Sequence, residues 1–202
     1  MTDRKSLRFS MRDRRRALSV EEQREASLAL SEHLAAHRLF HLAQRIAFYL
    51  PNDGEIDLGY LIEYAWQQNK HCYLPVLGPR NGRRMWFLPY RSDTQLTPNR
   101  FGIPEPIHSR RDRLFSPMSL DLVLMPLVAF DHAGNRVGMG GGFYDRTFGF
   151  RRYRRHWQRP WLLGTAYEFQ QVEQIDGAAW DVPLDGIVTE QGIQRFPAHT
   201  PD

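Results

Sequence analysis

A cluster of glycines is the feature of this sequence that most constrains its fold. Residues 137–146 read Val-Gly-Met-Gly-Gly-Gly-Phe-Tyr-Asp-Arg, an apolar run at 122–128 precedes them, and residues 143–148 have the composition of a helix start. Glycine has no Cβ atom, so the backbone N–H groups of such a loop can approach a bound group closely. A strand, a glycine loop and a helix N-terminus together predict a cradle for an anion such as phosphate.

Charged side chains around this loop support the phosphate prediction. Arg136 and Arg146 flank the loop and can neutralise a phosphate. Asp145 supplies a hard oxygen ligand of the kind that Mg²⁺ prefers beside phosphates. The loop matches neither the Walker pattern nor Gly-x-Gly-x-x-Gly followed by an acidic residue about twenty positions later. A tight turn that needs positive φ is the structural alternative.

The rest of the chain alternates between apolar segments of strand length and segments with helical spacing. Ser19 and Glu22 match the Ser-x-x-Glu capping box, which predicts the start of a second helix. The predicted helices lie at 3–17, from Ser19 onward, at 58–65 behind Asp57 as a cap, and at 143–157. The predicted strands lie at 45–50, 71–77, 85–88, 121–126, 161–166 and 183–189, the last of these ending the sheet.

This alternation predicts an α/β fold. We expect a single domain built as a three-layer sandwich, with a mostly parallel or mixed central sheet and helices on both faces. Its parts are N-terminal helices at 1–43, an α/β core at 44–190 and a tail at 191–202. Residues 91–118, rich in proline and polar residues, are expected to form a long excursion, and 130–137 a turn around Gly134.

The distribution of charge limits the function classes. Of the 27 Lys and Arg residues, 13 lie in residues 1–16 and 146–159, and acidic residues outnumber basic ones elsewhere. Nucleic-acid-binding proteins usually spread positive charge over a whole face, and two local patches fit a small polyanion such as a nucleotide at least as well. For Arg14, Arg15 and Arg16 we expect a solvated helix face.

Cysteine usage and hydropathy indicate a cytoplasmic protein. The single cysteine, Cys72, excludes an internal disulfide and fits a reducing compartment. No apolar stretch has the length of a membrane span, and the N-terminus shows no secretory signal. We expect a monomer that binds neither membranes nor nucleic acid.

Three further groups of residues are candidates for function. Glu55 follows a predicted strand and a tight turn, where α/β proteins place their sites; it can grip a donor-rich heterocycle or be an ordinary loop acid. His33, His37 and His41 recur every four residues, which aligns them on one helix face as a surface stripe or, less simply, a metal site. Asp185 is either a second carboxylate beside a metal or a turn residue.

Taken together, the sequence resembles the 5-formyltetrahydrofolate cyclo-ligase family. The resemblance runs from the basic N-terminal helix to Asp185, and it is most specific in Met-Pro-Leu-Val-Ala-Phe-Asp at 125–131 and in Gly-Asn-Arg-Val-Gly-Met-Gly-Gly-Gly-Phe-Tyr-Asp at 134–145. It implies closure of 5-formyltetrahydrofolate, with or without a polyglutamate tail, to 5,10-methenyltetrahydrofolate. ATP is the co-substrate and Mg²⁺ the cofactor, and ADP and phosphate are released.

The resemblance also implies roles for residues. Catalytic roles are implied for Arg136, Tyr144 and Asp145, and Mg²⁺ binding is implied for Asp145 and Asp185. Folate contacts are implied for Leu50, Glu55, Phe101 and Tyr144. ATP contacts are implied for Arg4, Lys5, Arg8, Arg136, Val137, Gly138, Met139, Gly140, Gly141, Gly142, Phe143 and Tyr144.

Three positions depart from the pattern of some family members. Met139 and Gly141 stand where those members carry Arg and Lys, so phosphate charge falls to backbone N–H groups, Mg²⁺, Arg136 and the N-terminal helix. Arg4 stands where lysine is frequent, which keeps the charge but changes its geometry. The alternative function is therefore a non-catalytic nucleotide- or folate-binding protein of the same fold.

Overall fold

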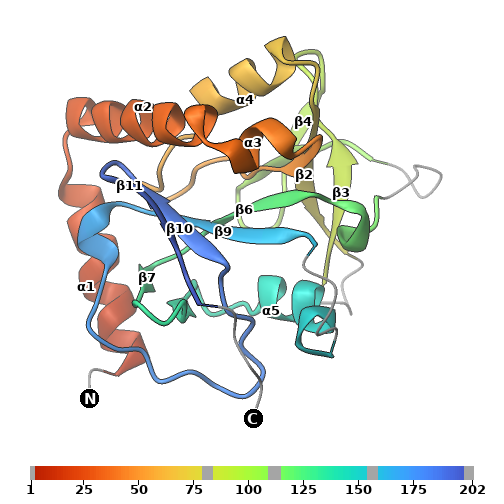
Figure 1. The fold of residues 1–202 in the computed structure, drawn as a ribbon. Helices are drawn as coiled ribbons and strands as arrows, with labels where there is room; N and C mark the ends of the chain where they lie inside the picture. Colours follow the sequence, from red (N-terminus) through yellow and green to blue (C-terminus); the bar gives the residue numbers. More distant parts are fainter. Residues whose placement is uncertain (1–2, 79–83, 109–114, 154–158, 198–202) are drawn as a thin grey trace.

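The computed structural model describes residues 3–78, 84–108, 115–153 and 159–197 (Figure 1). Its centre is a seven-stranded sheet. In spatial order the strands are β11 (Gly192–Arg195), β10 (Gly186–Thr189), β9 (Trp161–Thr165), β6 (Leu122–Pro126), β1 (Arg45–Ala47), β2 (His71–Leu77) and β3 (Met85–Pro89). Neighbours from β10 to β2 are parallel, and the edge strands β11 and β3 are antiparallel.

Helices cover both faces of this sheet, which confirms the three-layer prediction. On one face lie α2 (Val20–Ala36), α3 (Arg38–Leu42) and α4 (Gly59–Gln67) (Figure 1). On the other lie α5 (Phe143–Phe148) and the hairpin of β7 (Ala129–Phe130) and β8 (Arg136–Val137). Within β6, Leu122 and Leu124 join the core under α2 and α4, whereas Val123 and Met125 join the core under α5. A strand that is apolar on both faces belongs at the centre of a parallel sheet.

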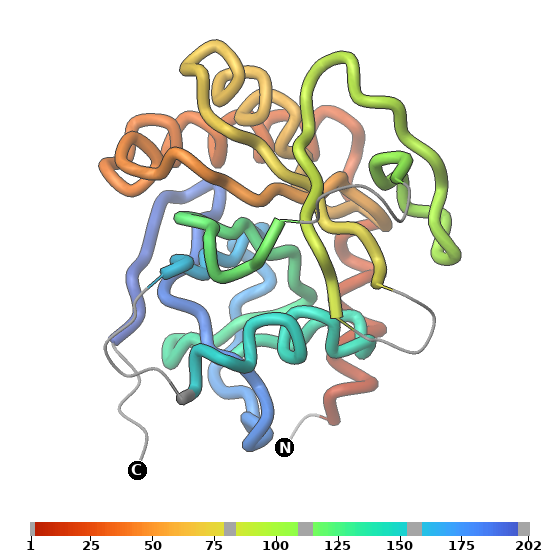
Figure 2. Tube along the Cα trace, turned by 90° about the vertical axis from the view of Figure 1, so that its right-hand side faces the viewer, coloured from red at the N-terminus to blue at the C-terminus, as the bar shows by residue number. Residues whose placement is uncertain are grey.

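The first helix, α1 (Arg4–Ala17), belongs to neither of these two layers on the faces of the sheet. Leu7 and Met11 pack against Val128, Ala129 and Val137 of the β7–β8 hairpin region. Figure 2 shows α1 beside the segment around residue 140, although the two are far apart in the sequence. The excursion after β3 contains the hairpin of β4 (Leu96–Pro98) and β5 (Pro104–Pro106). Short 3₁₀ helices span Pro117–Ser119, Gly149–Tyr153 and Glu168–Gln170.

Several local predictions are confirmed. The capping box forms, because Ser19 Oγ accepts from Glu22 N–H at 3.2 Å and Glu22 Oε2 accepts from Ser19 N–H at 2.7 Å. The predicted strand at 71–77 has the observed bounds. The prediction of Asp57 as a helix cap is wrong: α4 begins at Gly59, one residue later than predicted, and its N-cap is Leu58, which makes no side-chain capping bond. Asp57 still accepts from Gly59 N–H at 2.9 Å.

Other predictions are wrong at the ends of elements. The strand at Gly186–Thr189 does not end the sheet, since β11 follows it inside the expected tail. The three histidines do not share one helix: α2 ends at Ala36, and His37 begins α3 by accepting from Leu39 N–H at 3.1 Å. The predicted helix at 143–157 is α-helical only to Phe148 and continues as a 3₁₀ turn; residues 154–158 lie outside the described residues.

The order of the strands fixes where a site can form. From β1 the chain proceeds outward through β2 to β3, whereas from β6 it proceeds the other way through β9 and β10 to β11. The crevice at the carboxyl ends of β1 and β6 is therefore a topological switch point, where open α/β sheets bind ligands. No helix in the described part of the chain combines the length and apolar character needed to cross a membrane.

Candidate active site

A cavity of about 590 Å³ opens at this switch point. Its size suits an organic ligand, since binding pockets commonly measure about 300 to 1,000 Å³. Residues from six segments line it: Arg4 and Arg8 of α1; Tyr49, Leu50, Asn52 and Glu55 after β1; Leu74, Pro75, Leu77 and Met85 of β2 and β3; Asn99, Phe101, Ile103 and Pro104 of the β4–β5 hairpin; Pro126, Arg136 and 138–145 around the glycine loop; and Trp180 with Asp181.

The glycine loop forms one side of the cavity. Gly140 and Gly142 adopt left-handed φ angles of 96° and 62°, and Gly142 precedes the first residue of α5. A side chain at Gly142 would be strained there and would lie 2.9 Å from the guanidinium of Arg146. From α1, Arg8 Nε donates to Gly138 O at 2.7 Å. The loop is thus shaped by its glycines and held against a basic helix.

Arg136, which is buried, and Asp145, which is partly exposed, form an ion pair at the base of the loop. One terminal nitrogen of Arg136 donates to Asp145 Oδ1 at 2.6 Å, and Val182 N–H donates to the same oxygen at 3.2 Å. Arg136 Nε is buried and has no hydrogen-bond partner among the described residues. A buried guanidinium with spare donors on the wall of a cavity is suited to an anionic ligand.

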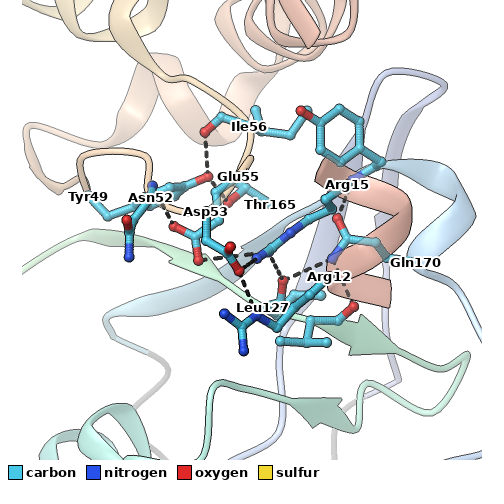
Figure 3. A network of polar contacts seen from close by, with 12 residues as sticks. Arg12, Arg15, Tyr49, Asn52, Asp53, Glu55, Ile56, Leu127, Thr165 and Gln170 are labelled. Carbon is cyan, nitrogen blue, oxygen red and sulfur yellow. Dashed lines mark hydrogen bonds and ion pairs between the residues drawn. The ribbon is translucent and has the colours of Figure 1, made fainter. Parts of the chain in front are cut away.

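Glu55 lies on the other side of the cavity, within the polar network of Figure 3. Its Oε2 accepts from Asn52 N–H at 3.1 Å, and its Oε1 lies 3.8 Å from a terminal nitrogen of Arg15. The side chain is 12% exposed. Burial raises the pKa of Glu55 to about 7, against the opposing effects of the Arg15 charge and the Asn52 N–H. This carboxyl group therefore changes its charge near neutral pH.

Asp53 ties this turn to α1. It accepts from Arg12 Nε at 2.6 Å and from Arg15 at 3.1 Å, and it also pairs with Arg16 (Figure 3 draws the first two). Burial alone would raise the pKa of Asp53, but the bonds from Arg12 and Arg16 outweigh it, so this pKa lies below its usual value. The expectation of a solvated face is wrong for Arg15, which is 1% exposed, because the Asp53 turn packs against that side of the helix.

Two tyrosines border the cavity as neutral hydrogen-bonding groups. Tyr49 Oη donates to Ile56 O at 2.9 Å and lies 2.9 Å from Thr165 Oγ1 (Figure 3). Burial raises the pKa of Tyr49 and of Tyr144 well above the usual value for tyrosine, and the Glu55 charge adds to both shifts. Both phenols therefore stay protonated at neutral pH and are able to donate a hydrogen bond.

Most of the predicted site residues meet in this cavity, but three do not. Lys5 is exposed on α1, Val137 is buried in the core against Leu7 and Met11, and neither lines the cavity. Asp185 also lies outside the lining: its two oxygens accept from Arg151 at 2.6 and 2.8 Å, and Leu162 N–H donates to it at 2.7 Å. This arrangement gives Asp185 a structural partner in Arg151.

Asp145 fits the role of a magnesium ligand beside phosphates. It lines the cavity, and both of its hydrogen bonds within the described residues go to Oδ1, which leaves Oδ2 for a ligand. Residues 3–78, 84–108, 115–153 and 159–197 contain no group of three or more His, Cys, Asp or Glu that could hold a metal alone. Mg²⁺ at phosphate sites commonly takes one or two carboxylates and fills its shell with phosphate and water oxygens.

Sequence reasoning missed several residues of the lining. Tyr49, Asn99, Trp180 and Asp181 line the cavity, and Arg4 donates to Asp181 at 2.6 Å. The position of Tyr49 directly after a strand at the switch point was a usable signal. No pattern in the sequence marks Trp180 or Asp181, which reach the site only because the chain after β9 returns past α1.

Comparisons with known proteins agree on one family. The model of the 5-formyltetrahydrofolate cyclo-ligase family matches residues 1–190. The 5-formyltetrahydrofolate cyclo-ligase of Escherichia coli K12 is 41% identical over 189 residues, which cover 92% of this chain and 100% of that protein. The Mus musculus protein of the same name is 30% identical and covers 92% of this chain and 93% of its own length.

Solved structures show the same fold. The Aquifex aeolicus 5,10-methenyltetrahydrofolate synthetase aligns with a TM-score of 0.79 at 30% identity, covering 98% of this chain and 95% of that one. The Mycoplasma pneumoniae 5,10-methenyltetrahydrofolate synthetase aligns with a TM-score of 0.71 at 22% identity, covering 94% and 99%, which bears on the fold alone.

Proposed function

This chain belongs to the 5-formyltetrahydrofolate cyclo-ligase family, and we propose that it converts 5-formyltetrahydrofolate to 5,10-methenyltetrahydrofolate with ATP and Mg²⁺. One observation carries the proposal. A single cavity joins a glycine loop with the basic groups Arg8 and Arg136 to a wall that holds the acid Glu55 and the aromatic Phe101. The first set suits a triphosphate, and the second suits a flat heterocycle with several donors.

The chemistry requires the two substrates to meet within this cavity. The formyl oxygen of the folate attacks the γ-phosphate of ATP, and ADP leaves. The neighbouring folate nitrogen then attacks the formyl carbon and loses its proton, and the former formyl oxygen departs with phosphate. Because an amide oxygen is a poor leaving group, the phosphoryl transfer makes ring closure possible. The protein's contribution is alignment and charge stabilisation.

Each side of the cavity has a distinct part in this scheme. Arg8 and Arg136 neutralise the phosphates, and the loop N–H groups donate to them. Asp145 holds Mg²⁺, which supplies a positive charge to the phosphate oxygens. Glu55 accepts from the donors of the pterin ring, Leu50 and Phe101 contact its faces, and Tyr144 donates a hydrogen bond to the reacting groups.

An absorbance assay tests this function directly. Purified protein, 5-formyltetrahydrofolate and Mg²⁺ are mixed with and without ATP, and formation of methenyltetrahydrofolate is followed by its absorbance. We expect a rise that depends on ATP. A folded preparation that gives no rise contradicts the proposal and favours a binding protein of the same fold. Met139→Arg and Gly141→Lys are then the substitutions to try first.

The single, buried thiol of Cys72 fits the cytoplasmic location that we assign to the enzyme.

A further inference from the structure

α1 connects the two sides of the cavity. Near its start, Arg8 bonds to the glycine loop, and one to two turns further along, Arg12, Arg15 and Arg16 meet Asp53 in the turn that precedes Glu55. An amphipathic helix needs no buried arginine to pack on a protein. The environment of Arg15 therefore calls for a reason of its own.

Arg15 is a buried cation with three partners on two segments, the turn at 52–55 and the residue after β6. Its terminal nitrogens lie 3.3 Å from Leu127 O, which follows β6, 3.1 Å from Asp53 Oδ2 and 3.8 Å from Glu55 Oε1 (Figure 3). The side chain is 1% exposed, and its Nε has no hydrogen-bond partner in the described part of the chain. Burying a guanidinium costs free energy that its ion pairs offset only in part, so such a pair is weak evidence for a role in stability.

A comparison with Arg12 and Arg16 distinguishes the anchoring of α1 from a second role of Arg15. Arg12 and Arg16 also bind Asp53, but their side chains are 34% and 51% exposed. They contribute to attaching α1 to the turn at little desolvation cost. Of these three arginines, Arg15 is the one whose guanidinium also lies beside Glu55. Arg15 therefore differs from Arg12 and Arg16 in its proximity to the Glu55 carboxyl group, since all three arginines take part in anchoring the helix.

We propose that Arg15 is a positioning residue for the folate, which fixes the turn that carries Glu55 and places a positive charge beside the Glu55 carboxylate. This inference rests on the proposed function, in which Glu55 accepts hydrogen bonds from the pterin ring. An ionised carboxylate offers only acceptors, whereas a protonated one presents a donor to the donors of the ring. Arg15 thereby favours the form of Glu55 that matches the ligand.

The proposal has a consequence for pH dependence. Because the pKa of Glu55 is about 7, folate affinity should fall as the pH drops below that value. Removing the charge of Arg15 takes away one effect that opposes the rise of the Glu55 pKa by burial. The pH midpoint of folate binding should therefore move to higher pH. Among the described residues, the charges of Arg12 and Arg15 of α1 and of Asp53 in the same turn act on the pKa of Glu55. The Glu55 charge in turn acts on the pKa of Tyr49, Tyr144 and Tyr167.

The experiment compares Arg15→Gln with Arg14→Gln in the full-length protein. Arg14 is the adjacent residue of the same helix; its guanidinium lies over the Phe169 ring at 4.4 Å and is exposed. Calorimetric titration with 5-formyltetrahydrofolate, in the presence of a non-hydrolysable ATP analogue, is repeated between about pH 6 and pH 9. We expect Arg15→Gln to raise the folate Kd about tenfold near pH 7 and to recover most of this loss near pH 9.

The control results separate this role from a general loss of structure. Arg14→Gln should keep the folate Kd of the parent protein, and the Kd for the ATP analogue should change less than about twofold in both variants. A folate Kd for Arg15→Gln that equals the parent value near pH 7 overturns the proposal. An equal weakening at every pH also overturns it, because a purely structural defect does not titrate with Glu55.

Two more variants keep the outcome decisive. If Arg15→Gln does not fold, Arg15→Lys replaces it, because lysine keeps the charge and loses the planar fork of the guanidinium. The pH midpoint of folate binding should then stay near that of the parent, while the folate Kd rises. An unchanged folate Kd contradicts the positioning role. Glu55→Gln tests the premise. If Glu55→Gln binds folate as tightly as the parent, the assigned role of Glu55 fails. If only the Arg15 variants behave as the parent, this inference fails alone.

Discussion

The two sides of the cavity are built in different ways. The turn at 52–55 is held by side chains before any substrate binds: Asp53 pairs with three arginines, and Glu55 accepts from a backbone N–H. The glycine loop at 138–142 is largely backbone, and Met139, its one side chain larger than hydrogen, is 48% exposed. One side is thus preorganised by buried charges, whereas the other owes its shape to backbone conformation.

This difference indicates how the two substrates are recognised. A heterocycle needs acceptors at fixed positions, and a buried, bonded carboxylate supplies them. A triphosphate carries its own charge and can order donors around itself, so the loop needs only glycine conformations and nearby cations. Substitutions on the turn side should therefore change folate affinity, and those on the loop side should change the phosphate step.

The largest expected effect is on the loop side. Asp145→Asn keeps the size of the side chain but removes the charge that pairs with Arg136 and holds Mg²⁺ in the proposed mechanism. We expect kcat to fall about 100- to 1,000-fold, the range for losing one electrostatic contact to a transition state. Folate binding should change little. Steady-state rates over a series of Mg²⁺ concentrations measure the change in kcat. If kcat of the variant at saturating Mg²⁺ equals that of the parent, Asp145 has no role in the site.

Asp185→Asn is the matched control for that experiment. Asp185 makes two bonds to Arg151 and lies outside the cavity lining. Its replacement should lower stability and leave kcat within about threefold of the parent. A loss of kcat as large as that of Asp145→Asn, in a protein with unchanged thermal stability, would restore Asp185 as a metal ligand.

On the turn side, Glu55→Gln should mainly weaken folate binding. It replaces a charged acceptor pair by one acceptor and one donor, and hydrogen bonds to charged groups contribute about 1.5 to 3 kcal/mol, so the KM for 5-formyltetrahydrofolate should rise about 10- to 100-fold. In the parent, this KM should also rise as the pH falls below about 7, because Glu55 then takes up a proton. The variant should lose that pH dependence. A parallel rise in the KM for ATP would contradict the division between the two sides.

The loop side offers a pair of glycines that differ in conformation. Gly142 has φ of 62° and a crowded Cβ position, whereas a Cβ atom at Gly138 would have its nearest neighbour 3.8 Å away. A left-handed alanine costs about 1 to 2 kcal/mol, so Gly142→Ala should raise the KM for ATP about tenfold and Gly138→Ala much less. Equal effects of the two substitutions would show that backbone conformation is not what shapes this loop.

The fold and the loop side were largely predictable from the sequence. The alternation of apolar runs gave the sheet, and Ser19 with Glu22 marked a helix start, because both depend on neighbouring residues. A turn that needs positive φ was the structural alternative for the glycine cluster, and Gly140 and Gly142 adopt such angles, whereas phosphate binding by this loop stays a prediction. Local sequence carries this information because backbone conformation and capping are local properties.

The turn side could not be predicted in the same way. Arg15 stands between Arg14 and Arg16 in a run that predicts solvent exposure, but it is buried by contacts with a turn about forty residues away and with Leu127 after β6. Likewise, Trp180 and Asp181 enter the cavity through the path of the chain after β9. The pairing of distant residues depends on packing, and a single sequence holds no signal for it here.

The smallest expected effect concerns a contact of this kind. Tyr49 Oη donates to the buried Ile56 O directly behind Glu55, so Tyr49→Phe leaves that carbonyl without its partner. Urea unfolding should show a loss of about 1 to 2 kcal/mol, and the folate KM should rise only a few-fold because the ion pairs of Asp53 still hold the turn. Tyr60→Phe, on the exposed face of α4, is the control and should match the parent. If Tyr49→Phe instead weakens folate binding as much as Glu55→Gln, the phenol and not the arginine–aspartate cluster is the main support of the turn.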